Sequence, residues 1–468
     1  MHPSPTPRRA RYRWLLVPRA NRFPRRRSDW LPLTLVVVLV LGLGAVGWNG
    51  SWLFDRITCR DGVFPSSEVW SSAHECVGLS NGPYAFGLDR YEPVMGTIGA
   101  QNTAADTGDP CGNGAAPVTV GVLLTLTDPG VGGRGVPQLE GMAAAQAEAN
   151  QRGCSRPIRL RIAQMGAAGQ AAVAVAQGLV DSPDLVAVVG LGLSTRESAE
   201  AIGLLARNQI PMVAAVITAV GFDAGGLGDD PAAFAGTCAD VNTYQRGFGG
   251  GFFYRVAFSN RAQIHQLHAY VEGRLHRHAD LIVTPTTVED PYTCTALPLL
   301  HQAFGAHVHE VRFNPVAEDV NPAVEQICRE RGAVTVMYAA RASDLSRYLI
   351  KLDELFAMGT CGPTSVTVVS PSDASRLRAP EPDGAEELRV AALRSASFAT
   401  GRVRLVYTPL AAPEVLAGSG PGFQRLREAF AAAGFSAAHL DDGWAENGYD
   451  VVTTVAAAVD SLSGRVDS

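Results

Sequence analysis

Residues 185–219 decide the fold class, and they read LVAVVGLGLSTRESAEAIGLLARNQIPMVAAVITA. The short apolar runs over 186–190 and 212–215 are typical of buried strands. Between them a helix is expected over 194–208, directly after the turn Gly-Leu-Gly-Leu. A strand, a helix and a strand in this order form a βαβ unit, so the two strands are expected to pair in parallel.

The same alternation continues on both sides of this unit. Strands are expected over 118–126 and 158–163 before it, and helices and strands alternate again between residues 260 and 370. A glycine-rich stretch over 221–251 interrupts the pattern and is a natural place to divide it. Because there are too many strands for one sheet, the sequence predicts an α/β fold with two doubly wound parallel-sheet lobes.

The N-terminal residues have the features of a membrane anchor. Nine arginines and no acidic residue lie within residues 1–27, and residues 31–48 form an uncharged apolar run. About 20 apolar residues cross a bilayer, and the positive-inside rule then places the arginine-rich head in the cytoplasm and the rest of the chain outside. A cleaved signal peptide is the alternative, because Ala45-Val46-Gly47 resembles a small-residue cleavage site.

The charge of the remaining chain argues against nucleic-acid binding. Residues 28–468 hold 30 basic residues against 45 acidic ones. A strongly acidic body repels a polyanion, so DNA and RNA are not expected partners.

All eight cysteines follow the apolar run, as expected for a chain in an oxidising compartment. We expect one disulfide between Cys59 and Cys76, close to the membrane. We expect a second between Cys328 and Cys361, because each follows or ends one of two successive crossover helices, which are often neighbours. Buried free thiols are the alternative.

These observations give an expected organisation of the whole chain. In order, it comprises a cytoplasmic head over 1–30, a transmembrane helix over 31–48, an irregular cysteine-containing juxtamembrane segment over 49–116, lobe 1 over 117–256, lobe 2 over 257–400, and a return to lobe 1 over 401–468.

Several stretches together resemble the type I periplasmic-binding-protein superfamily, in the branch of branched-chain amino acid (leucine/isoleucine/valine) binding proteins of ABC transporters. They are VTVGVLLTLTDPG, LEGMAAAQAEANQRG, residues 185–219 quoted above, FFYRVAFSNRAQ, VTVMYAARASDL and ENGYDVVTTVAAAVDSL. More narrowly, the chain is similar to membrane-anchored substrate-binding proteins. The resemblance implies two lobes joined by crossing strands, with a solute bound between them.

The resemblance also implies which residues bind the solute. Ser194 and Thr195 match polar residues that hold a ligand carboxylate at a helix N-terminus, where backbone N–H groups attract an anion. Val216, Ile217 and Thr218 match the segment that binds the amino-acid head, partly through main-chain atoms. Tyr292 matches an aromatic residue that lobe 2 places against the ligand, and Glu318 is the candidate acid for the ligand ammonium.

The match to this family has two gaps. The segment AQMGAAGQ lacks the usual acidic and polar residues. Family members also continue beyond the helix of 446–462 and cross between the lobes again, so the return to lobe 1 is expected to be truncated. Both gaps favour an alternative, a degenerate extracellular interaction or assembly module that binds no solute.

No catalytic or metal-binding pattern is convincing. The sequence lacks a GxSxG elbow and a phosphate-binding GxxxxGK[ST] loop. The histidines His265, His268 and His276 share a helix face with Glu272, which is expected to be a solvated surface rather than a metal site. We therefore expect no enzyme and no cofactor. The expected function is reversible binding of a small zwitterion, such as an amino acid or short peptide, with an ABC permease or a membrane signalling protein as partner.

Overall fold

The computed structural model divides the chain into two compact units, Met1–Ser67 and Glu68–Ser468. It describes residue 59 of the first unit. Of the second it describes residues 68–107, 116–152, 156–287, 290–305, 308–381, 384–412 and 421–466. The expected membrane segment over 31–48 lies outside these residues, and no helix among them is long and apolar enough to cross a bilayer.

Lobe 1 is built on a seven-stranded sheet with the order β1-β2-β4-β3-β5-β6-β7. Strands β3 to β7 pair in parallel with one another, as the βαβ pattern predicted. Strand β2 pairs antiparallel with both β1 and β4. The strands are β1 (Val69–Ser72), β2 (Glu75–Ser80), β3 (Val118–Leu124), β4 (Ile158–Gln164), β5 (Leu185–Gly190), β6 (Met212–Ala214) and β7 (Phe253–Arg255).

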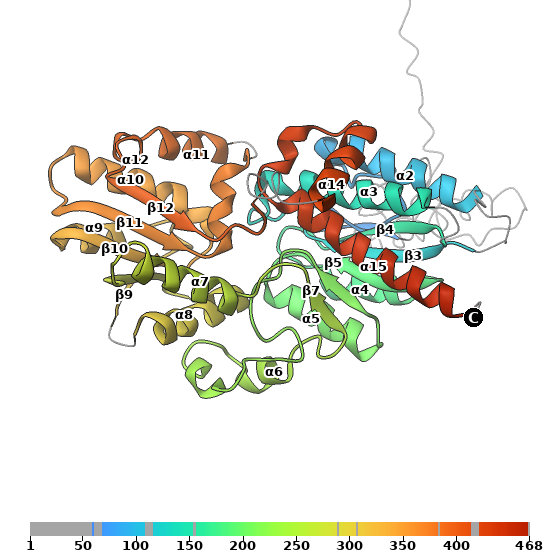
Figure 1. Ribbon diagram of the computed structural model, residues 1–468, viewed down its shortest axis with the longest axis horizontal. Helices are drawn as coiled ribbons and strands as arrows, with labels where there is room; N and C mark the ends of the chain where they lie inside the picture. The colour runs from blue at the N-terminus through green and yellow to red at the C-terminus, as the bar shows by residue number, and fades with distance from the viewer. Residues whose placement is uncertain are drawn as a thin grey trace, which may run out of the picture. The chain divides into compact units, whose positions relative to one another are not determined.

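Helices cover both faces of this sheet (Figure 1). One face carries α2 (Glu92–Thr107), α3 (Gly135–Gln151), α14 (Pro421–Ala432) and α15 (Trp444–Val466). The other carries α4 (Ala172–Val180) and α5 (Arg196–Arg207). Strand β3 is therefore buried at every position, which explains its continuous apolar sequence.

Lobe 2 is built on a five-stranded, fully parallel sheet with the order β12-β11-β10-β8-β9. Its strands are β8 (Leu281–Pro285), β9 (His309–Phe313), β10 (Gly332–Tyr338), β11 (Pro363–Ser370) and β12 (Val403–Tyr407). Two helices pack on one face, α7 (Asn260–Gly273) and α8 (Pro291–Phe304). The other core contains α9 (Asn321–Arg329), α10 (Leu345–Ala357) and α11 (Ala385–Arg394), with α12 (Ala396–Ala399) beside them.

The described part of the segment before lobe 1 is ordered rather than irregular, so that expectation was wrong. Residues 69–80 form the β1–β2 hairpin, which extends the sheet of lobe 1 at β4. Helix α2 then packs on α3 and β4 and buries Val94, Met95 and Ile98. Its sequence conceals this role, because a narrow apolar stripe is interspersed with glycine, asparagine and threonine.

Two expected boundaries also need correction. The return to lobe 1 was placed at residue 401, but β12 pairs with β11 and belongs to lobe 2. The glycine-rich stretch was placed wholly in lobe 1, but its residues 227–244 contribute to a core of lobe 2. In both cases the partner of the segment is distant in sequence, so local periodicity carries no information about which lobe it joins.

Candidate functional site

Polar residues from both lobes meet where the parallel strands end, and we call this group the interlobe site. In open parallel sheets, ligands bind outside the carboxyl ends of the strands. The segments that follow β3, β5 and β6 of lobe 1 carry Asp128, Ser194 with Thr195, and Val216 to Thr218. The segments that follow β8, β10 and β11 of lobe 2 carry Asp290 with Tyr292, Arg341, and Asp373.

Arg341 joins the two lobes directly. Its Nη2 atom donates to the Ser194 carbonyl oxygen of lobe 1 and to Oδ1 of Asp290 in its own lobe, at 2.7 Å in each case. The guanidinium also lies 4.5 Å from the ring centroid of Tyr292. Within the described residues only Nη2 has a hydrogen-bond partner, so the N–H groups of Nε and Nη1 remain for another acceptor.

The electrostatic surroundings keep Arg341 charged. Burial on its own would lower the pKa of this guanidinium. The carboxylates of Asp290, Asp373 and Asp128, together with Tyr292, outweigh that effect and raise it above its ordinary value. The residue was not predicted as part of the site, although its position directly after a parallel strand was a usable signal.

Ser194 brings two of the predicted segments together. Its side chain is buried, and its Oγ accepts hydrogen bonds from the backbone N–H groups of Thr218 at 3.2 Å and Ala219 at 3.3 Å. Thr195 caps α5, because its Oγ1 accepts from the Ser198 N–H at 3.2 Å. The helix therefore begins two residues later than expected, and Ser194 has a structural role at the base of the site.

The segment 216–218 is closed to solvent in this structure. Val216, Ile217 and Thr218 are all buried. The Ile217 carbonyl accepts from Arg255 Nη1 at 3.2 Å, and the Thr218 carbonyl accepts from the Asn260 N–H at 2.6 Å. These two carbonyls therefore stabilise the crossing between the lobes.

Tyr292 lies in the interlobe site, at the first turn of α8. Asp290 caps this helix by accepting from the Tyr292 N–H at 3.0 Å. The phenol is buried, and its Oη has no hydrogen-bond partner of good geometry among the described residues. Burial raises the pKa of Tyr292 far above its ordinary value, so the hydroxyl stays protonated and can donate.

Two carboxylates of the site form no ion pair within the described residues. Asp128 accepts from the Gly130 N–H at 2.6 Å, and Asp373 accepts from the Ala342 N–H at 2.6 Å. Burial raises the pKa of Asp128, an effect that the Gly130 N–H and Arg341 partly oppose. Because these acids come from opposite lobes, a cationic group placed between them would interact with both.

Glu318 is not brought to these residues. It lies exposed in the turn between β9 and α9, and its Oε2 pairs with Arg347 Nη2 of α10 at 2.8 Å. The resemblance implied that Glu318 faces a ligand ammonium, and its pairing with Arg347 does not support that role. The fold places Asp128, Asp290 and Asp373 in the interlobe site, and of these Asp290 pairs with Arg341.

The structure contains the expected Cys328–Cys361 disulfide and also a Cys238–Cys294 disulfide. Cys59 and Cys76 are both disulfide-bonded, and their pairing with each other stays a prediction. His268 pairs with Glu272 at 3.2 Å, and no group of three or more potential metal ligands occurs among the described residues.

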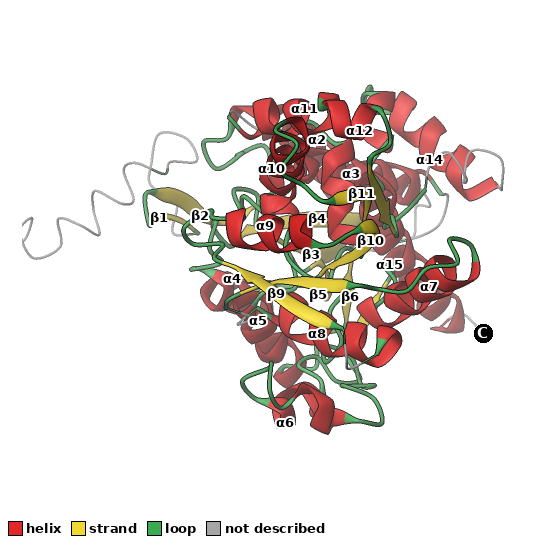
Figure 2. Ribbon diagram, turned by 90° about the vertical axis from the view of Figure 1, so that its left-hand side faces the viewer, coloured by secondary structure: helices red, strands yellow, loops and turns green. Residues whose placement is uncertain are grey.

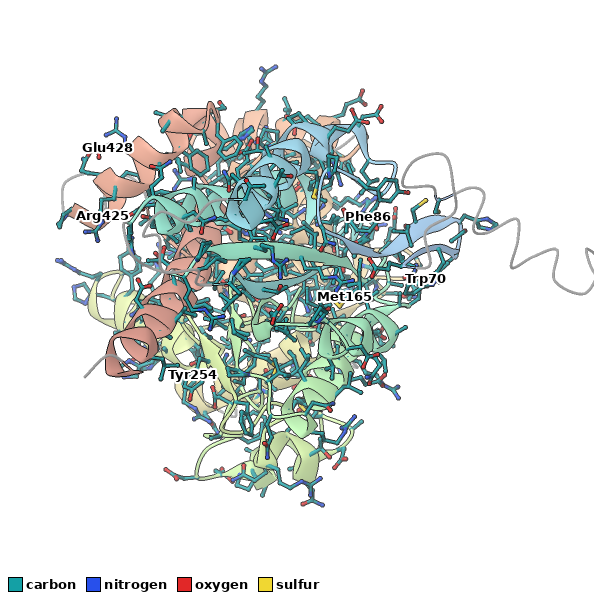
Figure 3. The ribbon with its side chains drawn as sticks, turned by 90° about the vertical axis from the view of Figure 1, so that its right-hand side faces the viewer. Trp70, Phe86, Met165, Tyr254, Arg425 and Glu428 are labelled. Atoms are coloured by element: carbon teal, nitrogen blue, oxygen red, sulfur yellow. A yellow bond between two sulfur atoms is a disulfide. The ribbon has the colours of Figure 1, made fainter. Side chains whose placement is uncertain are left out.

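A separate groove of about 970 Å³ lies between α2, α3 and α14. Its lining is rich in alanine, and Arg425 and Glu428 project from α14 at its edge (Figure 3). Strand ends do not converge there, and the Glu148 carboxylate on its wall already binds Arg152 and Tyr449. The groove is therefore a weaker candidate than the interlobe site.

Comparison with known proteins gives structural similarity alone. No protein-family model matches the sequence, and no curated protein is significantly similar to it. Among solved structures, an ABC transporter substrate-binding protein from Sphaerobacter thermophilus is 21% identical with a TM-score of 0.53, covering 75% of this chain and 82% of that one.

Two further structures are solute-binding proteins of ABC transporters from R. palustris, solved in complex with 4-hydroxybenzoate and with p-hydroxybenzoic acid. They are 13% and 14% identical, and each has a TM-score of 0.51 and covers 74% of this chain and 82% of its own. The chain therefore has the two-lobed α/β fold of the substrate-binding proteins of ABC transporters.

Proposed function

We propose that this protein is an extracellular receptor that reversibly binds a small zwitterion, such as an amino acid or short peptide, between its lobes. The observation that carries the proposal is the meeting of complementary charges from opposite lobes at the strand ends. Arg341, whose Nε and Nη1 have no hydrogen-bond partner among the described residues, lies beside Asp128 and Asp373, two carboxylates that form no ion pair within that part of the chain.

The two charged ends of such a ligand have distinct partners in this arrangement. Its carboxylate would accept from Arg341, close to the N-terminus of α5 where the helix dipole favours negative charge. Its ammonium would lie between Asp128 and Asp373. A ligand held from both lobes favours the closed arrangement over the open one, and this is how binding would be communicated to a permease or a membrane signalling partner.

The proposal includes attachment to the membrane through the apolar run over 31–48, with the arginine-rich head in the cytoplasm. It includes no bond-making chemistry, because the residues of the site supply hydrogen bonds and charges that suit recognition. The fold relatives described above support this assignment, since they are themselves substrate-binding proteins.

The test is thermal unfolding of the full-length protein against amino acids, short peptides and other small polar metabolites. A compound that binds only the folded state stabilises it by about 2.7 kcal/mol at a hundred times its dissociation constant. Arg341→Ala is expected to abolish the shift. Arg347→Ala is the matched control, because it removes an arginine of the same lobe whose partner is Glu318.

The outcomes separate the possible assignments. A shift that is lost in Arg341→Ala and kept in Arg347→Ala supports the interlobe site. A shift lost only in Arg347→Ala would instead place the ligand at the Arg347–Glu318 pair. A folded protein that no compound stabilises would contradict the receptor and favour the interaction module. Ser194→Ala is not a suitable test of ligand binding, because it leaves the buried N–H groups of Thr218 and Ala219 without their acceptor and so destabilises the fold.

A further inference from the structure

Residues 221–251 form a loop that we call the strap, and its base is fixed to lobe 1. The N–H groups of Phe248 and Gly249 donate to the carbonyls of Gly221 and Phe222, at 3.0 and 2.8 Å, and so close the loop on itself. The Phe222 ring is fully buried in the core of lobe 1, 5.7 Å from Phe253 of β7.

An ion pair reinforces this base. Oδ2 of Asp223 accepts from Arg255 Nη2 at 2.6 Å, and Arg255 belongs to β7. Burial lowers the pKa of Arg255, which Asp223 opposes. The base of the strap is thus held by an aromatic cluster and by an ion pair in which the Arg255 side chain is largely buried and the Asp223 side chain is 38% exposed.

The tip of the strap belongs to lobe 2. Phe234 and Cys238 are buried in the core formed by α7 and α8, and Cys238 is disulfide-bonded to Cys294 of α8. Thr237 Oγ1 adds a hydrogen bond to the Cys294 carbonyl at 2.9 Å. Helix α6 (Val241–Arg246) leads back to the base, and in Figures 1 and 2 it lies below α5 and α8.

The strap also lies close to the interlobe site. Cys294 is only two residues from Tyr292. Tyr244 of α6 is buried, and its pKa is raised by burial and by the charge of Asp290, whereas Arg196 of α5 opposes the rise. The strap therefore passes from one lobe to the other at the edge of the residues proposed to hold the ligand.

We infer that the strap, covalently fastened at its tip, limits how far the two lobes can open. If the lobes rotate apart about their crossing segments, the base must follow lobe 1 and the tip must follow lobe 2. The disulfide prevents the tip from leaving α8. Opening then requires either that the arms between base and tip stretch, or that Phe222 and the Asp223–Arg255 pair withdraw from lobe 1, which exposes a fully buried ring and breaks an ion pair.

Chain length alone would not impose this limit. The arm over 224–233 contains ten residues, and an extended chain spans up to about 3.3–3.6 Å per residue. A stretched arm could therefore follow a wide opening. The arm is folded instead, because Leu227 is fully buried and its carbonyl accepts from Arg261 Nη2 at 2.5 Å. The restraint thus depends on packing at the base together with the covalent bond at the tip.

The experiment compares two pairs of substitutions that each remove one disulfide. Cys238→Ser with Cys294→Ser frees the tip of the strap, and Cys328→Ser with Cys361→Ser is the matched control within lobe 2. Spin labels are attached to azide-bearing amino acids at the exposed positions Glu200 of α5 and Glu325 of α9. Double electron–electron resonance on the full-length protein without ligand then reports the distance between the lobes.

Freeing the tip is expected to broaden the distance distribution and shift it to longer distances, whereas the control pair should match the wild type. A further variant keeps both disulfides and lengthens both arms by Gly-Ser-Gly insertions after the exposed residues Ala224 and Arg246, which lie between the base and the residues packed on lobe 2. It should show the same shift, and it decides the matter if the serine pair does not fold. A wild-type distribution in either folded variant would overturn the inference. Because no ligand is used, this outcome is independent of the solute-binding test.

Discussion

At the scale of single residues, the N-terminal turn of α15 contains a buried acid, Glu446. Glu446 is 4% exposed, and neither of its carboxylate oxygens has a hydrogen-bond partner among the described residues. Burial, with a smaller contribution from the charge of the nearby Asp442, raises the pKa of Glu446 from the ordinary 4.5 to about 8. Burial also raises the pKa of Asp442, to about 6. Folding therefore favours the protonated form of both acids.

This arrangement makes stability depend on pH. The unfolded chain releases the Glu446 proton near pH 4.5, whereas the folded chain keeps it up to about pH 8. Between these values the folded state binds more protons, so the free energy of unfolding falls as the pH rises, by about 1.4 kcal/mol per pH unit for this group. Glu446→Gln is expected to flatten the dependence and to stabilise the protein at pH 8.

Urea unfolding at pH 5, 6.5 and 8 measures this effect. The difference in unfolding free energy between Glu446→Gln and wild type should grow from pH 5 to pH 8. Glu428→Gln is the control, because it removes one carboxylate from an exposed position of α14. Parallel pH profiles for Glu446→Gln and wild type would contradict the prediction.

At the scale of secondary-structure elements, one side chain of α2, Asn102, joins this helix to lobe 1 through four hydrogen bonds. Asn102 is buried, and its Nδ2 donates to the carbonyls of Asn81 at 2.7 Å and Leu160 at 2.8 Å. Its Oδ1 accepts from the Leu160 N–H at 2.9 Å and from Gln146 Nε2 at 2.8 Å. One amide thus joins α2 to β4 and α3 and uses its full hydrogen-bonding capacity.

Asn102→Leu is therefore expected to destabilise lobe 1 by about 3 kcal/mol or more, because it leaves several buried polar groups unpaired. Asn208→Ala, which removes one exposed side-chain bond at the end of α5, should cost less than about 1 kcal/mol. Urea unfolding of both variants measures the difference. Equal losses would mean that α2 is an appendage and not an integral helix of the lobe.

At the scale of the whole molecule, the proposed anchor makes a separate prediction. Full-length protein expressed in cells should stay in the membrane pellet after extraction with alkaline carbonate, because an apolar run of this length partitions into the bilayer. A chain without residues 1–48 should appear in the soluble fraction. Release of the full-length protein by carbonate, or its recovery without residues 1–47, would favour the cleaved signal peptide.

Much of the fold follows from sequence because its information is local. Buried parallel strands are continuous apolar runs, and each crossover helix begins with its own cap, as Thr195 and Asp290 do. The alternation of these elements was enough to predict two lobes built on parallel sheets, whereas the segments over 194–195 and 216–218 were predicted from the resemblance to a known family; Ser194 joins these two segments in the structure. Tyr292 was likewise predicted from that resemblance.

Only the tertiary structure decided what depends on partners distant in sequence. It assigned β12 and the strap tip to lobe 2, it made α2 part of lobe 1, and it placed Arg341 beside Ser194 across 147 residues. It also placed Glu318 away from the interlobe site, in an ion pair with Arg347. Periodicity reports which face of an element is buried, whereas the identity of the covering surface is set by packing and by hydrogen bonds between loops, which leave no periodic trace in the sequence.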